Sequence, residues 1–421
     1  MNTQFLTFRQ NRFVGKVREN KTDKFVFYLC LIDVLFIPYA FFIAISYSFF
    51  VLLPWLFVRY HDLNYKYKDF KLYLGFSALA VVSTVIGIVA HGSPSENISR
   101  CIQIIQILGY FFMFRYYLDE HSVNIKSYLL LFCVFVVSFC AIYNVDKSLY
   151  IQIIHFWNPR GLSSTASLYT NLIGYRYSFL WMDPNNIAYM FVGIIAFIIT
   201  NEKTEMLTNI ILIIGLTFVL ISAMSSGGFL SAGIEVAVLV IFRFMRKAKR
   251  GRFLVVKMSS FITLCLSPAI VYGAKRIWDF YSQSLIAIES FERISGNSAD
   301  SRLEIWNRIL NQTNFFLYIL IGFGGVTYVA GRPQKPHNGH LYIILAFGFI
   351  AYFIFLYIVF RKRHITPLYN YIWIISVFLG FTANVLVGEV KLSAVIMLLA
   401  ACASSEKYLS DRKHIQVEET D

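Results

Sequence analysis

Residues 25–58 decide the topology of this chain; they read FVFYLCLIDVLFIPYAFFIAISYSFFVLLPWLFV and carry a single charged side chain, Asp33. A membrane-spanning helix needs about 20 mostly apolar residues. The stretch therefore makes either two short helices or one bent helix with a hinge near Pro38, since proline disrupts the helical hydrogen-bond ladder. We predict two helices, 25–40 and 41–58, and the membrane side of every later loop depends on this choice.

The composition predicts an integral membrane protein. Of the 421 residues, 57% are hydrophobic and 15% are charged, and the mean hydropathy is +0.59, which is too apolar for a water-soluble fold of this length. We therefore predict an all-α, polytopic helical bundle with about 12 transmembrane helices. The predicted spans are 25–40, 41–58, 70–91, 98–115, 125–143, 185–201, 206–223, 228–245, 253–273, 339–360, 367–386 and 390–405.

The basic residues orient these helices. A net charge of +14 suggests a nucleic-acid partner, but the basic residues lie mainly in short loops beside apolar segments, so we expect no nucleic acid. Short loops rich in Lys and Arg stay in the cytoplasm. Three of them fall on the same side as the basic N-terminal tail: 59–71, 243–252 and 361–364.

This orientation gives the domain organisation. We predict a cytoplasmic tail at 1–24, one transmembrane domain at 25–405 and a cytoplasmic tail at 406–421. Two long loops then lie outside, at about 144–184 and at 274–338, the second of them before the last three helices. We expect the chemistry there, because loops held by a rigid scaffold commonly carry function.

The second outer loop belongs to the longest polar interruption of the chain, residues 273–342. Outer loops normally avoid arginine, yet this one carries several, which suggests that it binds an anion. The planar fork of arginine suits the oxygens of a phosphate or diphosphate. The alternative is a solvated loop in which nearby Glu and Asp pair with the arginines. The arginines considered for diphosphate binding are Arg276, Arg293, Arg302 and Arg332.

The same loop ends in Pro336-His337-Asn338-Gly339-His340, directly before an apolar helix. Asn338 is a good N-cap, so the helix is expected to begin beside His337. The free N–H groups of a helix start attract phosphate and favour a neutral imidazole, which can accept a proton from a sugar hydroxyl. The alternative is a histidine that only caps or anchors. No carboxylate cluster completes a metal site with His340, so we expect no metal and no cofactor.

Further polar groups fall at the outer ends of the middle helices. Asp183-Pro184-Asn185 begins a span, and the turn with Ser226 offers backbone N–H groups for an anion, although a plain hairpin turn explains it equally. Inside the spans lie three charges, Asp33, Glu235 and Lys257. Ionisable groups within a membrane are functional candidates, but the sequence suggests no specific role for Asp33.

Several segments in the second half of the chain resemble one family. The run SRLEIWNRIL (301–310), then GFGG (322–325), then HNGHL (337–341) resembles the shared core of the bacterial O-antigen ligases and O-antigen polymerases. MDPNNIAYMF (182–191), preceded by Arg176, is similar to a pattern in many polymerases. The resemblance covers roughly residues 176–400 and favours the polymerases.

This resemblance implies glycosyl transfer outside a bacterial cytoplasmic membrane, without a metal. The implied donor and acceptor are glycan repeats on undecaprenyl diphosphate, and a chain-length regulator is a further candidate partner besides the membrane lipids. By position, His337 and Arg302 match the catalytic residues of the family. Members often have an arginine after the serine at the turn with Ser226, whereas this chain has Gly227. Arg176, Arg276 and Arg293 are the expected replacements, with Asn338, Asp183, Asn185 and Ser226 in support.

Two other functions remain open. An O-antigen ligase would pass the same glycan to lipid A-core instead of to a second lipid-linked repeat. A flippase or transporter of lipid-linked repeats would also need about a dozen spans and basic groups, but would place them along a central cavity with broken helices near the midplane. The sequence places its basic groups at one face, which favours the enzyme.

Overall fold

The fold is described from a computed structural model of the chain. It describes residues 20–37, 46–157, 176–179, 184–201, 205–225, 228–229, 231–237, 307, 311, 321–322, 324, 328–329, 332–333, 338–360, 390–405 and 407–408.

These residues are almost entirely helical, as the sequence predicts. The helices are α1 (Lys21–Phe36), α2 (Phe49–Val58), α3 (Tyr60–Lys66), α4 (Lys68–His91), α5 (Pro94–Glu120), α6 (Ile125–Val145), α7 (Lys147–Trp157), α10 (Pro184–Asn201), α11 (Met206–Ala223), α17 (Gly339–Phe360) and α19 (Val390–Ser404). A two-residue antiparallel ladder joins β1 (Tyr328–Val329) to β2 (Arg332–Pro333), with Val329 opposite Arg332.

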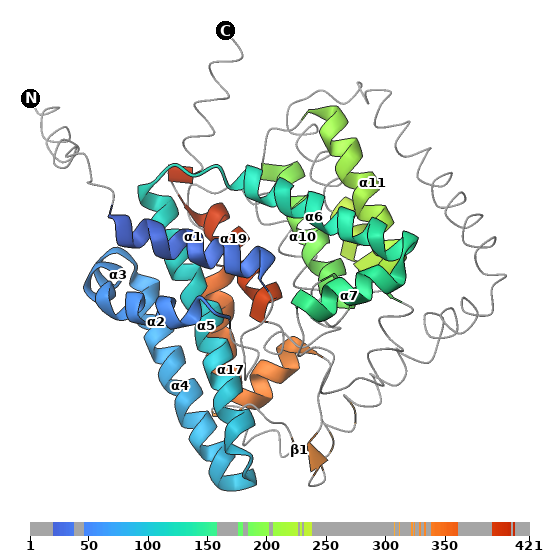
Figure 1. The fold of residues 1–421 in the computed structure, drawn as a ribbon. Helices are drawn as coiled ribbons and strands as arrows, with labels where there is room; N and C mark the ends of the chain where they lie inside the picture. The colour runs from blue at the N-terminus through green and yellow to red at the C-terminus, as the bar shows by residue number, and fades with distance from the viewer. Residues whose placement is uncertain are drawn as a thin grey trace, which may run out of the picture.

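Helix α5 is the centre of the bundle. It is the least apolar of the long helices, yet 89% of the residues in its most apolar stretch are buried. The reason is that α1, α2, α4 and α19 all pack on it. Its interior face carries polar side chains that are fully buried, among them Gln106 and Arg115. Figure 1 shows α4 and α5 side by side, with α17 against α4. Helices α6, α7, α10 and α11 form a second group around one another.

Helices α1 and α2 run antiparallel, so the chain turns back within the stretch 25–58. At their shared end, Asp23 of α1 accepts hydrogen bonds from Trp55 Nε1 (2.8 Å) and from Arg59 Nε and Nη2 (3.0 and 2.6 Å). Burial opposes the charge on Arg59, but its hydrogen bonds to Asp23 and Asp62 outweigh this effect and raise the pKa of the guanidinium. The two helices are therefore held together at this end by a charged pair.

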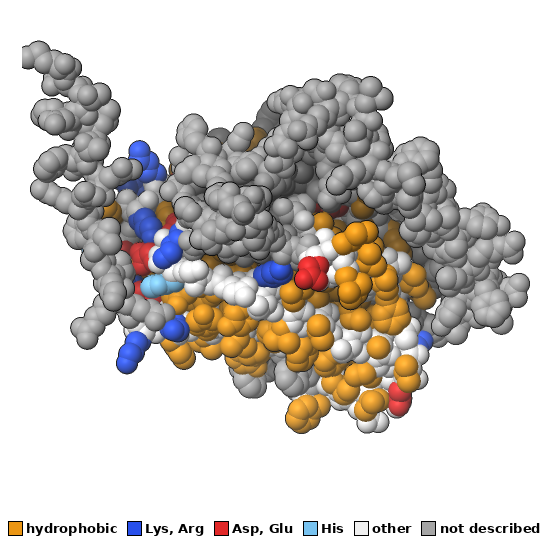
Figure 2. Space-filling view, turned by 90° about the horizontal axis from the view of Figure 1, so that it is seen from above, with side chains coloured by type: hydrophobic (Ala, Val, Ile, Leu, Met, Phe, Trp, Pro, Cys, Tyr) orange, Lys and Arg blue, Asp and Glu red, His pale blue; other side chains and the backbone are white. Residues whose placement is uncertain are grey.

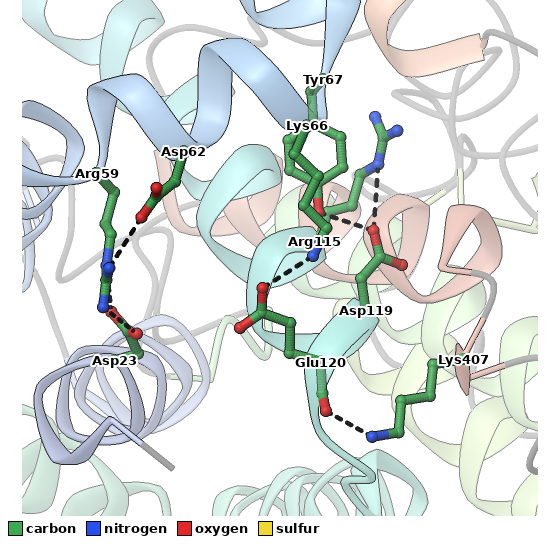
Figure 3. A network of polar contacts seen from close by, with 9 residues as sticks. All are labelled: Asp23, Arg59, Asp62, Lys66, Tyr67, Arg115, Asp119, Glu120 and Lys407. Carbon is green, nitrogen blue, oxygen red and sulfur yellow. Dashed lines mark hydrogen bonds and ion pairs between the residues drawn. The ribbon is translucent and has the colours of Figure 1, made fainter. Parts of the chain in front are cut away.

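At the same end of the bundle, polar residues at the end of α3, the start of α4, the end of α5 and just after α19 form the network of Figure 3. Lys66 bonds Glu120 Oε1 at 3.1 Å, and Lys407 bonds the main-chain oxygen of Glu120 at 2.5 Å. Arg115 is 2% exposed; its guanidinium stacks on Tyr67, 4.2 Å from the ring centre, and contacts Asp69 at 3.3 Å. The network thus ties the start of α4, the end of α5 and the residues after α19 to one face.

Large apolar side chains cover the outside of the bundle, as expected where a protein meets lipid. Val89 of α4 is 82% exposed, Val134 of α6 is 60% exposed and Ile214 of α11 is 63% exposed. Figure 2 shows a broad apolar surface with most of the charged side chains gathered at its left edge. Among the described residues, five helices are long and apolar enough to cross a membrane: α4, α5, α6, α11 and α17.

The bounds of α10 and α19 match the predicted spans 185–201 and 390–405, whereas α2 begins at Phe49, later than the predicted 41. All three are shorter than a full span. The predicted spans 253–273 and 367–386 lie outside the described residues, and 228–245 is described only in part. Residues 147–157, expected in an outer loop, form α7. Tyr150 of α7 donates to the main-chain oxygen of Phe179 (2.8 Å), which fixes part of the loop against the helices.

A substitution at Gly109 tests the packing of α2 on α5. A Cβ atom there would lie 3.1 Å from Leu56 Cδ1 and 3.5 Å from Leu52 Cδ2, so Gly109→Leu should overpack the contact and cost about 1–3 kcal/mol. Gly75 of α4 has no atom within 4 Å of such a Cβ, and Gly75→Leu is the matched control. Thermal unfolding in detergent should show a lower midpoint for the first variant alone; equal midpoints would contradict this packing.

Candidate functional site

One group of predicted site residues meets where α10 begins and α11 ends. Pro184 opens α10, a position that suits proline because the first N–H of a helix has no partner to lose. Helix α11 ends before Met224, whose left-handed φ of 47° leaves the last carbonyls without helical partners. Arg176 Nε donates to Ala223 O at 2.9 Å, and its Nη2 donates to Met224 O and Asn185 Oδ1 at 3.2 Å each.

The position of Arg176 has a clear structural role. Its positive charge caps the negative end of α11, where a cation is favourable. It also joins that end to the start of α10 through Asn185. Its role in diphosphate binding stays a prediction, and any such contact would be made by a guanidinium already held by two carbonyls and an amide oxygen.

The turn after α11 packs closely on the same two helices. Ser225 Oγ donates to Asn185 Oδ1 (2.8 Å) and accepts the N–H of Gly228 (3.1 Å). A Cβ atom on Gly228 would lie 2.6 Å from Ala188 Cβ and 2.9 Å from Leu220 Cδ2, so only glycine fits there. Because the N–H groups of Gly228 and Phe229 both bond to Ser225, this part of the turn favours the plain hairpin over an anion nest.

A second group of motif residues lies at the start of α17. The helix begins at Gly339, and Asn338 is its N-cap: Asn338 Oδ1 accepts the N–H groups of His340 (3.0 Å) and Leu341 (3.1 Å). The predicted cap is therefore confirmed. It places the start of α17 directly after His337, which itself lies outside the described residues.

Helix α17 is broken at its centre, whereas the sequence predicts a continuous span over 339–360. Gly348 has φ 88° and ψ 166°, a conformation that is essentially restricted to glycine. His340 Nδ1 lies 3.3 Å from Tyr352 Oη, although twelve residues of straight helix would separate their backbones by about 18 Å. The two halves therefore bend sharply toward each other. Although α17 is long and apolar enough to cross a membrane, it does not do so as one straight helix, and neither half alone has the length of a span.

Gly322 and Gly324 of the GFGG segment lie against this break. Ala346 O, which the break deprives of its helical partner, accepts the N–H of Gly324 at 2.8 Å. A Cβ atom on Gly322 would lie 2.1–2.2 Å from the backbone of Ala346 and Phe347, so the two main chains touch only because Gly322 has no side chain. Gly322, Gly324 and the break in α17 therefore form one unit, in which neighbouring chain supplies the hydrogen bond that the break removes.

The start of α5 completes this unit and adds an arginine that the sequence analysis missed. A Cβ atom on Gly324 would lie 2.4 Å from Asn97 Oδ1, so the GFGG segment also rests on α5. Arg100 follows one turn later and donates to Gln103 Oε1 at 3.1 Å. Arg100 Nη2 also lies 3.8 Å from Glu96 Oε1. An arginine at the outer end of a predicted span contradicts the positive-inside pattern, and that signal was available in the sequence.

The remaining predicted site residues are not placed by the structure. His337, Arg302, Arg276, Arg293, Asp183 and Ser226 lie outside the described residues, and Arg332 is described only through its place in β2. Within the described part of the chain, no group of three or more His, Cys, Asp or Glu residues could hold a metal ion.

Substitution of Gly348 tests the break in α17. Gly348→Ala would place a Cβ in a strained conformation, at a cost of about 1–3 kcal/mol, or straighten the helix and expel the GFGG segment. Gly233→Ala is the control, because Gly233 lies in helical chain with open space around it and alanine favours a helix. We expect a lower unfolding midpoint for Gly348→Ala and an unchanged or higher one for Gly233→Ala. A Gly348→Ala protein as stable as the control would show that the helix does not need this break.

Comparison with protein-family models finds none that matches this chain, and comparison with curated proteins finds no significant match. The sequence and structure together establish a helical membrane protein in which separate glycine, arginine and asparagine motifs meet at helix ends.

Proposed function

We propose that this protein polymerises oligosaccharide repeats carried on undecaprenyl diphosphate, at the outer face of a bacterial cytoplasmic membrane. A hydroxyl of the acceptor glycan attacks the anomeric carbon of the donor glycan, and undecaprenyl diphosphate leaves. Because diphosphate is a good leaving group, the reaction needs positive charge and orientation more than it needs a metal.

The observation that carries this proposal is the meeting of motif segments at helix ends. Gly324 of the GFGG segment bonds Ala346 at the break in α17, the helix that begins at the HNGHL motif. Arg176 and Asn185 form a second such contact at the end of α11. Apolar packing of the helices alone would not require hydrogen bonds between these particular segments.

Helix α5 starts at the α17 unit and ends in the polar network of Figure 3, whereas α6 starts just after that network and ends near Ser222, to which Asn144 donates at 2.9 Å. We propose that the end of α11 and the start of α17 face the same side of the membrane. In the proposed orientation these ends face outward.

The roles follow from this arrangement. His337, directly before the N-cap of α17, would accept the proton of the attacking hydroxyl, since a helix start favours a neutral imidazole. Arg302, Arg276 and Arg293 would bind the diphosphate. Arg100 is a further candidate for the charge that Gly227 does not supply, because it lies beside the α17 unit.

One observation favours a second candidate, a flippase or transporter of lipid-linked repeats. Such proteins have broken helices near the midplane, and α17 is broken at Gly348. The sequence interpretation that polar groups gather at one face is also incomplete, because Asp33 and Lys391 pair within the bundle. Lys391 lies within the predicted span 390–405 but was not among the charges named within the spans.

Glycan analysis of a deletion strain separates these functions. Complementation with His337→Ala should leave lipid A-cores capped by single repeats, because loss of the base lowers transfer about a hundredfold or more. Arg302→Ala should do the same. The control is His121→Ala, because His121 lies at the opposite end of α5.

Each other outcome would point elsewhere. Normal ladders from His337→Ala would remove the base assignment. Uncapped cores would indicate a ligase, and lipid-linked repeats that accumulate on the cytoplasmic side would indicate a flippase. Production of each variant is measured in the same membranes, so that loss of protein is not read as loss of chemistry.

A further inference from the structure

The bundle interior holds an ion pair that joins the two ends of the sequence. Lys391 Nζ lies 2.5 Å from Asp33 Oδ1 and donates to the main-chain oxygen of Asp33 at 2.8 Å. The side chain of Lys391 is 0% exposed and that of Asp33 is 1% exposed. Charges this deep are costly unless they are paired. Lys391 is therefore a buried charge within a predicted span that the sequence analysis did not single out.

The pair lies where three helix ends meet. Asp33 belongs to the last turn of α1, and its main-chain oxygen also accepts the N–H of Ile37 at 3.3 Å. Asp33 Oδ2 accepts the N–H of Ser48, the residue that precedes α2, at 2.8 Å. Lys391 is the second residue of α19. Figure 1 shows α1 crossing α5 and α19 in this region.

The charges match the helix ends of α1 and α2. The end of a helix carries partial negative charge and attracts cations, whereas the start of a helix attracts anions. The Lys391 ammonium lies at the end of α1, and the Asp33 carboxylate lies at the start of α2. Lys391 is, however, at the start of its own helix, where a cation is unfavourable, so its position depends on the oxygens of Asp33.

A chain of hydroxyl groups orients the carboxylate. Ser48 Oγ donates its only hydrogen to Asp33 Oδ2 at 2.5 Å. The 2.6 Å contact between Ser48 and Tyr110 must therefore be donated by the Tyr110 hydroxyl. Gln106 Nε2 donates in turn to Tyr110 Oη at 3.0 Å. Every hydrogen bond in this chain points toward the carboxylate, which keeps Asp33 as an acceptor and turns Oδ1 toward the cation.

Three helices place the pair far from the polar network at the end of the bundle. Ten residues of α1 separate Asp33 from Asp23, a rise of about 15 Å. Nine residues of α5 separate Tyr110 from Asp119, about 14 Å, and thirteen residues of α19 separate Lys391 from Ser404, about 20 Å. Measured along these helices, the pair therefore lies about 14–20 Å from the polar network.

We propose that the junction of α1 and α2 is a binding site for one small monovalent cation, formed by Asp33 Oδ1 and Asp33 O, and that the Lys391 ammonium fills it in this chain. A carboxylate oxygen and a main-chain carbonyl at a helix end are among the groups that bind sodium inside membrane transporters. An ammonium group has the same charge and donates to the same oxygens. A cation at this site is what holds α1, α2 and α19 together.

The test removes the resident cation and supplies another. Full-length protein is extracted and purified in methylammonium, sodium or choline chloride at equal concentration, and the unfolding midpoint and the yield of monodisperse protein are measured. Lys391→Ala should be less stable in choline, which is too large for the site, and should recover by several degrees, in a saturable manner, with methylammonium or sodium. Wild-type protein should respond equally to the three salts.

Two variants separate the site from general salt effects. Lys391→Met fills the same space without a charge and should show no recovery. Asp33→Asn/Lys391→Ala lacks the carboxylate and should be insensitive to the salt. The proposal is overturned if Lys391→Ala behaves alike in the three salts, which includes the case in which no folded protein is recovered in any of them. It is also overturned if the double variant recovers with sodium as the single variant does.

Discussion

The arrangement of this protein depends on satisfying charges and helix ends within a medium that offers no water. Asp33 and Lys391 are the clearest case, because neither could remain in the interior without the other. Their contact joins residues 358 positions apart, so the first and last described helices of the bundle hold one another. The buried polar face of α5 follows from the same constraint, because Tyr110 and Gln106 complete the hydrogen bonds of the pair.

At the break in α17, the backbone hydrogen bonds are completed in another way. Helix-breaking residues are tolerated inside membranes when neighbouring segments supply the lost hydrogen bonds. Here Gly324 bonds the carbonyl of Ala346, and the missing side chain of Gly322 lets the segments touch. This explains why GFGG and the start of α17 occur in one chain in this order. It also ties the break in α17 to the start of α5, because Gly324 packs against Asn97.

The sequence predicted the helices well, because long apolar runs have few alternatives in a membrane. It predicted the N-cap Asn338 from side-chain chemistry alone. It could not predict the break at Gly348, since the surrounding run is uniformly apolar and hydropathy carries no information on φ and ψ. It missed the partnership of Asp33 with Lys391, because pairing between distant helices depends on packing rather than on local pattern. Arg100 was overlooked although its position contradicts the charge rule applied elsewhere.

A double-mutant cycle between Asp33 and Lys391 tests most directly whether this pair holds α1, α2 and α19 together. The free energy of unfolding in detergent is measured for wild type, Asp33→Asn, Lys391→Met and the double variant. Each single variant leaves a charge buried without its partner and should lose about 3–5 kcal/mol. The double variant should lose far less than the sum of the two. Losses that simply add would contradict the account, because they would show that the two side chains contribute independently.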